Sequence, residues 1–288
     1  MTAPIQPVVE HGSGLLKLPT VGELIRMVSA IVQRRQLIYE LAKRDITDRY
    51  SGQALGSFWA FGHPALQLAV YVFVFNFVFR AKVDSGGLSS QDYVTYILSG
   101  LIPWLTLQEI INRSATVLVA HSNLVKQTVL PLEVLPLKVV LSALGTQLVS
   151  MVGLVLYVGL TQRGLSPSYL LLPIVIVLQI LFVVGAAFVL SALTVFVRDL
   201  KDAVLVFSYV GVYLVPVVYS PAWVPALVRP LLYLNPFSHL AWCFQDVIFY
   251  CSIQHPVAWV VTAVFSVWLF AVGYRLFHRL RPLFGRVL

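Results

Sequence analysis

Residues 168–197 read SYLLLPIVIVLQILFVVGAAFVLSALTVFV and carry no charged side chain. A bilayer core of about 30 Å needs roughly 20 helical residues to cross it, so this stretch is long enough to span a membrane. Similar uncharged runs occur at 57–79, 139–160, 203–220 and 256–274. A shorter run, 93–108, reaches that length by extending through Glu109 to about residue 118. The sequence therefore predicts an all-α, polytopic membrane protein with six transmembrane helices.

The composition agrees with this interpretation. Hydrophobic residues make up 59% of the 288 residues and charged residues only 11%, whereas soluble domains have roughly half apolar and about a quarter charged residues. The excess of apolar side chains must face lipid. Cys243 and Cys251 are the two cysteines. They have neither CxxC spacing nor a histidine pair nearby, so they fit ordinary apolar positions better than a disulfide.

The basic residues point to the orientation of the chain in the membrane. The net charge is +8, and Lys and Arg concentrate in the N-terminal arm and the C-terminal tail. They recur at Lys126, Lys138, Arg198 and Lys201, which lie on one side of the membrane if six spans alternate. The positive-inside rule then places both termini in the cytoplasm. Basic charge distributed in this way orients a chain against anionic lipid and predicts no nucleic-acid partner.

Four segments are expected along the chain. Residues 1–30, which begin with a Pro- and Gly-containing stretch lacking an apolar signal region, predict a flexible cytoplasmic tail. Residues 31–52 predict an amphipathic helix in the membrane interface, with a solvated helix packed on other protein as the alternative. Residues 53–278 form the six-span domain, and residues 279–288 form a second cytoplasmic tail.

The stretch before the last span is apolar but interrupted. Residues 216–255 contain five prolines together with Arg229, His239 and Asp246. Irregular backbone at membrane depth is tolerated only against protein or a water-filled cavity. A re-entrant external helical hairpin at 221–250 satisfies this rule. One poor seventh span is the alternative, but it would place the C-terminal arginines outside.

Several catalytic and nucleotide-binding motifs are absent from the sequence. It contains no GxxxxGK[ST], HExxH, DxD or GxSxG pattern, so the chain has no P-loop for ATP. Proton-coupled transport requires ionisable groups within the bilayer. The positions available for such a relay are Glu109, His63, Asp246 and His239.

Aromatic side chains form one regular stripe on the first predicted span. Tyr71, Phe75 and Phe79 repeat every four residues and share one helix face. Together with tyrosines on the fifth span, this stripe could line a path for sugars, because flat rings pack on apolar faces while polar tips form hydrogen bonds. Packing against lipid or partner helices is the alternative.

The chain resembles the transmembrane subunit of type-2 ABC exporters, specifically the branch that exports lipid-linked polysaccharides: O antigen, capsule and teichoic acid. The resemblance covers about residues 36–275. It is carried in order by LIYELAKRDITDRYSGQALGSFWAFGHPALQLAVYVFVFNFVFR, SNLVKQTVLPLEVLP, VFVRDLKDAV and PVVYSPAWVPALVRPLLYLNPFSHL. Two positions depart from the family pattern. Leu132 and Gln245 stand where the family often has arginine.

The resemblance implies a non-enzymatic transport subunit in a bacterial inner membrane. Similar proteins form homodimers of six-span subunits and bind two copies of a separate P-loop ATPase. This chain would then hold no cofactor of its own, because ATP and Mg²⁺ bind to the partner. The cargo would be a polyprenyl-pyrophosphate-linked polysaccharide, O antigen first, moving through a channel at the dimer axis lined by the first, second and fifth spans.

The resemblance also assigns expected roles to individual residues. The channel residues would be Tyr71, Phe75, Phe79, Trp104, Tyr209, Tyr213 and Tyr219. The lipid pyrophosphate would bind Arg44 and Arg49. As basic residues, both could instead serve only to orient the chain in the membrane. ATPase docking would use Arg35, Glu40, Asn123, Leu124, Lys126 and Glu133. The external gate would include Trp223, Arg229, Asn235, Pro236 and His239.

Other functions remain open from the sequence. A type-2 ABC exporter of a drug, a lipid, teichoic acid or capsule would share the same architecture. A polyprenyl-dependent membrane transferase would show acidic or histidine pairs in a membrane-edge loop, and none cluster that way. A secondary transporter would tend to have interrupted helices in both halves, whereas the broken segment lies in the C-terminal half.

Overall fold

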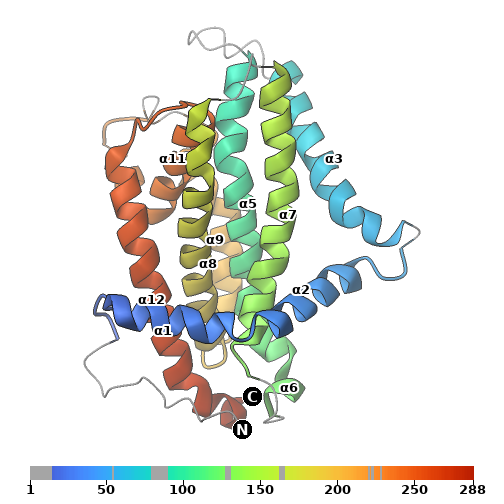
Figure 1. Cartoon of the computed structure of the whole chain (residues 1–288), viewed down its shortest axis with the longest axis vertical. Helices are drawn as coiled ribbons and strands as arrows, with labels where there is room; N and C mark the ends of the chain where they lie inside the picture. Colours follow the sequence, from blue (N-terminus) through green and yellow to red (C-terminus); the bar gives the residue numbers. More distant parts are fainter. Residues whose placement is uncertain are drawn as a thin grey trace.

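The computed structural model describes residues 15–53, 55–78, 90–126, 131–161, 166–219, 221, 224–227 and 229–288. All regular secondary structure in these residues is helical, which confirms the predicted all-α class. Four long helices run side by side and form the body of the molecule (Figure 1). They are α5 (Ser90–Ala120), α7 (Val134–Thr161), α8 (Leu172–Thr194) and α12 (Pro256–Val287).

These four helices account for four of the six predicted spans. Each is long and apolar enough to cross a bilayer, α8 together with the 3₁₀ turn Pro167–Leu171 that precedes it. The predicted run 93–118 lies within α5. Helices α8 and α12 cross at Gly185 and Gly273, where a Cβ atom built on Gly273 would lie 2.4 Å from the Gly185 carbonyl oxygen. Such small residues let membrane helices approach closely.

The other two predicted spans are shorter helices. Helix α3 (Trp59–Phe73) continues into a π-helical turn, Val74–Val78, and diverges from the bundle toward the end where α2 lies (Figure 1). Helix α9 (Leu200–Gly211) ends well before residue 220, and residues 212–217 form turns. Prolines cannot donate an N–H and clash with the preceding helical turn, so Pro216 prevents the helix predicted over 203–220 from continuing.

A flexible tail is predicted over residues 1–30, but its last ten residues are helical. Helix α1 spans Val21–Val32 and begins with a capping box, in which Thr20 and Glu23 satisfy each other's backbone N–H groups. Helix α2 spans Arg35–Arg49, so the single helix predicted over 31–52 is two helices with a break at Gln33 and Arg34. Both lie across the end of the bundle (Figure 1).

Short helices occupy both ends of the bundle. Helix α6 (Ser122–Lys126) contacts α5 and α12. Helices α10 (Arg229–Leu234) and α11 (Pro236–Ile248) form the pair of short helices expected within 221–250. At about 1.5 Å per residue, α11 is about 20 Å long and cannot cross a bilayer alone. Residues 279–288, predicted as a tail, continue helix α12 as far as Val287.

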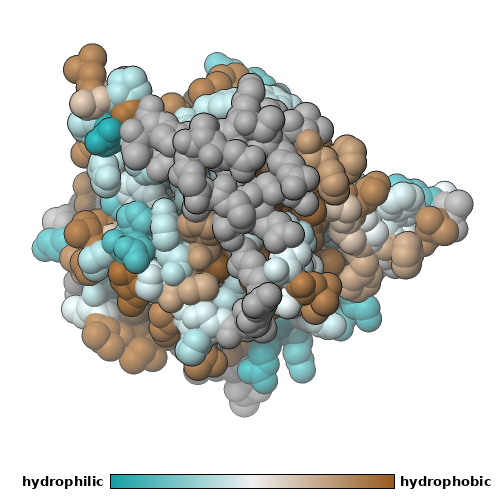
Figure 2. All heavy atoms as spheres, turned by 90° about the horizontal axis from the view of Figure 1, so that it is seen from above, coloured by the Kyte–Doolittle hydropathy of each residue, from teal (hydrophilic) through white to brown (hydrophobic). Residues whose placement is uncertain are grey.

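The outer surface is largely apolar. Along α3 and the π-helical turn that follows it, Phe61, Leu66, Val70, Phe73 and Phe77 are all about half or more exposed. Viewed from above, hydrophobic side chains cover much of the side from which α3 projects (Figure 2). Large exposed apolar surfaces mark contact with lipid or a partner. The surface therefore agrees with the spans in placing this part of the protein in a membrane.

Candidate functional site

A cluster of charged residues joins the end of α2 to α5 and α7. Arg49 at the end of α2 contacts the Glu109 carboxylate at 2.6 Å and the Asp45 carboxylate at 3.5 Å. Arg113, one turn after Glu109 on α5, contacts Asp45 at 2.5 Å and Glu109 at 3.1 Å. Lys138 on α7 lies 3.9 Å from Asp45. The two carboxylates therefore hold three cations, and the cluster connects three helices.

The cluster is only partly shielded from solvent. The side chain of Asp45 is 14% exposed, and those of Arg49, Glu109 and Arg113 are between 26% and 29% exposed. Partly buried pairs are screened less by salt than fully exposed pairs. Both arginines also donate to the Ser142 hydroxyl, at 3.4 Å and 3.0 Å. These contacts position the end of α2 on α5 and α7.

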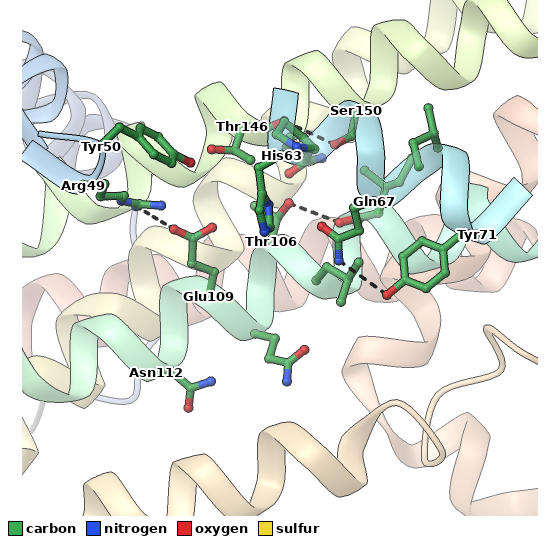
Figure 3. A pocket seen from close by; sticks show the side chains of 16 residues that line it. Arg49, Tyr50, His63, Gln67, Tyr71, Thr106, Glu109, Asn112, Thr146 and Ser150 are labelled. Atoms are coloured by element: carbon green, nitrogen blue, oxygen red, sulfur yellow. Dashed lines mark hydrogen bonds and ion pairs between the residues drawn. The ribbon is translucent and has the colours of Figure 1, made fainter. Parts of the chain in front are cut away.

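A cavity of about 520 Å³ opens beside this cluster (Figure 3). Helices α3, α5 and α7 supply most of its wall, and the Arg49–Glu109 pair lies at one end (Figure 3). Its polar lining residues, other than that pair, are Tyr50, His63, Gln67, Tyr71, Thr106, Gln108, Asn112, Thr146, Gln147 and Ser150. Pro64, Leu68, Ile102 and Leu105 are the apolar ones. Most of the lining residues therefore carry a neutral hydrogen-bonding group, set among apolar surface.

The resemblance assigned Arg44 and Arg49 to a lipid pyrophosphate, and the two lie in different environments. Arg44 is well exposed and pairs with Asp48 at 3.5 Å within α2. Exposed pairs of this kind contribute little, so the Arg44 guanidinium remains accessible to an anion. Arg49, by contrast, is already paired with Glu109 and Asp45. An anionic group could bind Arg49 only by competing with these carboxylates.

Most residues assigned to ATPase docking lie on the surface at the α1–α2 end. Arg35, Glu40, Asn123, Leu124 and Lys126 are exposed. Glu133 is different, because its side chain is only 7% exposed and forms ion pairs with Arg34 and, at 3.3 Å, with Arg281. Glu133 therefore joins the α1–α2 break to the end of α12 and does not present a free carboxylate for docking.

The described aromatic residues that were assigned to the channel lie on several different elements. Tyr71 and Phe75 stack with ring centroids 6.3 Å apart, while Phe79 lies outside the described residues. Tyr209 and Tyr213 are 66% and 68% exposed on α9. The Tyr219 hydroxyl donates to the Tyr213 carbonyl at 2.8 Å.

Trp104 does not line an open path within the chain. It is 4% exposed and packs against Phe207 and Phe237. A Cβ atom on Gly211 would lie only 2.5 Å from its ring. Trp104 therefore belongs to the core at the α5–α9 contact, which the spacing of the sequence could not show.

Three of the residues assigned to the external gate, Asn235, Pro236 and His239, lie at the corner between α10 and α11. The Asn235 side chain caps α11 by accepting from the Phe237 N–H at 3.0 Å, and it donates to the Leu214 carbonyl. Pro236 occupies the first turn of α11, where no N–H is required. A ring nitrogen of His239 lies 2.8 Å from the Tyr233 carbonyl oxygen. Trp223 lies outside the described residues, and Arg229 begins α10.

The two departures from the family pattern occupy buried positions. Leu132, in the turn before α7, is 7% exposed, and Gln245 on α11 is 0% exposed. The Gln245 side chain donates to the Pro216 carbonyl at 3.0 Å. Neutral side chains at these two positions therefore fit their surroundings.

Among the groups considered for a proton relay, Asp246 has a structural role. Its carboxylate accepts from the His255 backbone N–H and the Trp259 ring N–H, each at 3.0 Å, and lies 2.7 Å from a His255 ring nitrogen. These contacts fix the connection between α11 and α12. In the part of the chain that the structure describes, no group of three His, Cys, Asp or Glu residues is placed to hold a metal ion. Cys243 and Cys251 are both free.

The sequence interpretation missed most of the polar cavity. The sequence offers Glu109 for a proton relay, but it identifies neither its partner Arg113 nor Asp45, the carboxylate that shares Arg49 and Arg113 with it. The available signals were the opposite charges of Glu109 and Arg113 four residues apart and the spacing of Gln108 and Asn112 within an apolar run. Spacing alone could not show that these faces meet α3.

Comparisons with known proteins agree with this architecture. The family described as "ABC-2 type transporter" matches residues 36–249. The O-antigen export system permease protein RfbA of Myxococcus xanthus is 26% identical over 266 residues, covering 91% of this chain and 99% of that protein. A protein of the same name from Klebsiella pneumoniae is 24% identical over 255 residues, covering 88% and 95%. Because the family match covers most of its length, the chain belongs to the ABC-2 type transporter family.

Proposed function

We propose that this chain is the membrane subunit of an ATP-driven exporter that moves lipid-linked O antigen across the bacterial inner membrane. The observation that carries the proposal is similarity over nearly the whole chain to proteins named O-antigen export system permease. Four long apolar helices provide the expected membrane-embedded body. The chain itself performs no hydrolysis, and a separate P-loop ATPase supplies the energy from ATP and Mg²⁺.

The exposed residues at the α1–α2 end support ATPase docking on that side. Asn123, Leu124 and Lys126 are exposed on α6, and Arg35 and Glu40 are exposed on α2. With two ATPase copies and two copies of this chain, closure of the ATPases would push on α6 and shift α5 and α7 through the connected helix ends. Both chain termini would then lie in the cytoplasm, in line with the positive-inside rule.

In the same arrangement, α3 and α9 with their flanking turns complete the set of six spans. The short helices α10 and α11 enter the membrane from the external side and return, as a gate. The polysaccharide channel runs at the homodimer axis, beside the exposed α9 tyrosines. Arg44, whose guanidinium is accessible, attracts the polyprenyl pyrophosphate at the cytoplasmic membrane edge.

Deletion and purification together test this function. In a strain lacking the gene for this chain, we expect lipid-linked O antigen to accumulate inside the cell and to disappear from the surface. The native complex, purified in mild detergent, should contain a P-loop ATPase at one copy per copy of this chain. Normal surface O antigen in the deletion strain would refute the cargo assignment. Absence of an ATPase, also with ATP analogues present, would refute the exporter.

A further inference from the structure

The cavity between α3, α5 and α7 places many polar groups at mid-length of apolar helices. Thr146, Gln147 and Ser150 lie near the middle of α7, and Thr106 and Gln108 near the middle of α5. Polar side chains at membrane depth are costly unless they face protein or a water-filled cavity. The Thr106, Thr146 and Ser150 hydroxyls donate to carbonyls of their own helices, and Gln147 pairs with Gln179. Gln67, Gln108 and Tyr71 line the same space of about 520 Å³ and indicate a hydrated site.

The chemistry of the wall distinguishes between a neutral and an anionic ligand. The charged groups of the wall, Arg49 and Glu109, pair with each other at 2.6 Å. Arg113, behind this pair, is held by the same Glu109 and by Asp45. A phosphate would have to displace a carboxylate from an arginine. The Gln67 and Gln108 amides can instead donate to and accept from a neutral hydroxyl-rich ligand, and the serine and threonine hydroxyl oxygens of the wall can accept from it.

The shape of the lining agrees with such a ligand. Tyr71 presents a ring and a hydroxyl to the cavity, and Gln67 reaches that hydroxyl at 3.4 Å (Figure 3). This weak contact leaves the Gln67 amide available for exchange with a ligand. Leu68, Ile102 and Leu105 add apolar surface. Ligand sites of roughly 300–1,000 Å³ commonly combine apolar walls with a few placed polar groups.

We infer that this cavity is a binding subsite for uncharged sugar units of the exported glycan, separate from the place where the lipid pyrophosphate binds. This inference rests on the proposed export function. It assigns glycan contact to the first, second and third spanning segments, through Gln67, Gln108 and Ser150, in addition to any contact at the dimer axis. The Arg49–Glu109 pair closes the charged end of the subsite and keeps it neutral.

Cysteine accessibility in lipid nanodiscs containing the whole exporter complex tests the subsite. Ser150→Cys, in a Cys251→Ser background that retains export, places a thiol in the cavity. Leu148→Cys is the matched control, because Leu148 lies two residues away on the same helix, is 61% exposed and does not line the cavity. We expect a charged maleimide to label Ser150→Cys and to leave the lipid-facing Leu148→Cys unlabelled. Gln108→Cys provides a second cavity thiol if Ser150→Cys assembles poorly.

Ligand protection then identifies the chemical class. The probes are maltoheptaose, the host's own O polysaccharide freed of lipid, and inorganic pyrophosphate at matched ionic strength. A saccharide present at about ten times its dissociation constant should slow labelling about tenfold by mass action, whereas pyrophosphate should not. Unlabelled cavity thiols, protection by pyrophosphate, or no protection by either saccharide would each overturn the inference. Labelling does not depend on transport, so a failed export assay remains a separate result.

Discussion

The contact between Gly185 on α8 and Gly273 on α12 leaves no room for a methyl group. A Cβ on Gly273 would lie 2.4 Å from the Gly185 carbonyl oxygen, and one on Gly185 would lie 2.5 Å from the Leu269 carbonyl carbon. Both obstacles are backbone atoms, so a side-chain rotation cannot relieve the clash. Moving the methyl to an ordinary contact distance of about 3.4 Å requires the helices to separate by about 1 Å, which disturbs a close-packed interface.

Gly273→Ala should therefore destabilise the chain. Overpacking costs roughly 1–3 kcal/mol, and the better helix propensity of Ala offsets up to about 1 kcal/mol. Gly159→Ala on α7 is the matched control, because no atom lies within 4 Å of its added Cβ. The control should gain up to about 1 kcal/mol from propensity alone. The same Gly→Ala change should therefore lower the stability at position 273 and raise it at position 159.

Thermal unfolding of the purified chain in detergent, followed by loss of the monodisperse chromatographic peak, measures this difference. Each 1 kcal/mol corresponds to a shift in Tm of about 2–4 °C for a chain of roughly this size. We expect Gly273→Ala to unfold below the wild type and Gly159→Ala at or above it. If Gly273→Ala proves as stable as Gly159→Ala, the close α8–α12 crossing is wrong.

Three further predictions concern polar contacts between helices. Gln147 and Gln179 exchange side-chain hydrogen bonds at 2.7 Å and 2.9 Å. Gln147→Leu should therefore lower the free energy of unfolding by about 1–2 kcal/mol, and the variant with leucine at both positions should recover much of this loss. No recovery in thermal unfolding would contradict the pairing. Glu133→Gln should weaken the contact between the α1–α2 break and α12, seen as faster hydrogen exchange in α1, and unchanged exchange would count against it. The Thr20 backbone N–H lowers the pKa of the Glu23 carboxyl below its usual value of about 4.5. Its stabilisation of α1 is therefore present above pH 4.5 and lost as the pH falls through the lower folded pKa. Exchange in α1 should rise over that range in the wild type, and Glu23→Gln should abolish the dependence.

The long apolar helices were predictable because their signal is local. The uncharged runs at 139–160 and 256–274 each lie within a single helix. The run at 168–197 largely overlaps α8 together with the turn that precedes it. The broken character of 216–255 was also visible, because prolines interrupt it. Helix α1 was missed although Thr20 and Glu23 form the spacing of a capping box, because the neighbouring prolines and glycines suggested a tail.

The sequence by itself determined that the chain is helical, crosses a membrane and has no P-loop, because length, hydropathy and motif spacing are properties of consecutive residues. Tertiary structure decided which polar groups face one another. The family resemblance assigns Tyr71 and Trp104 alike to the channel, whereas packing buries Trp104 against Phe207 and leaves Tyr71 at the polar cavity. The partners of Glu109 come from a helix more than fifty residues away as well as from its own. Such contacts depend on how helix faces meet in space, which no periodicity along a single helix records.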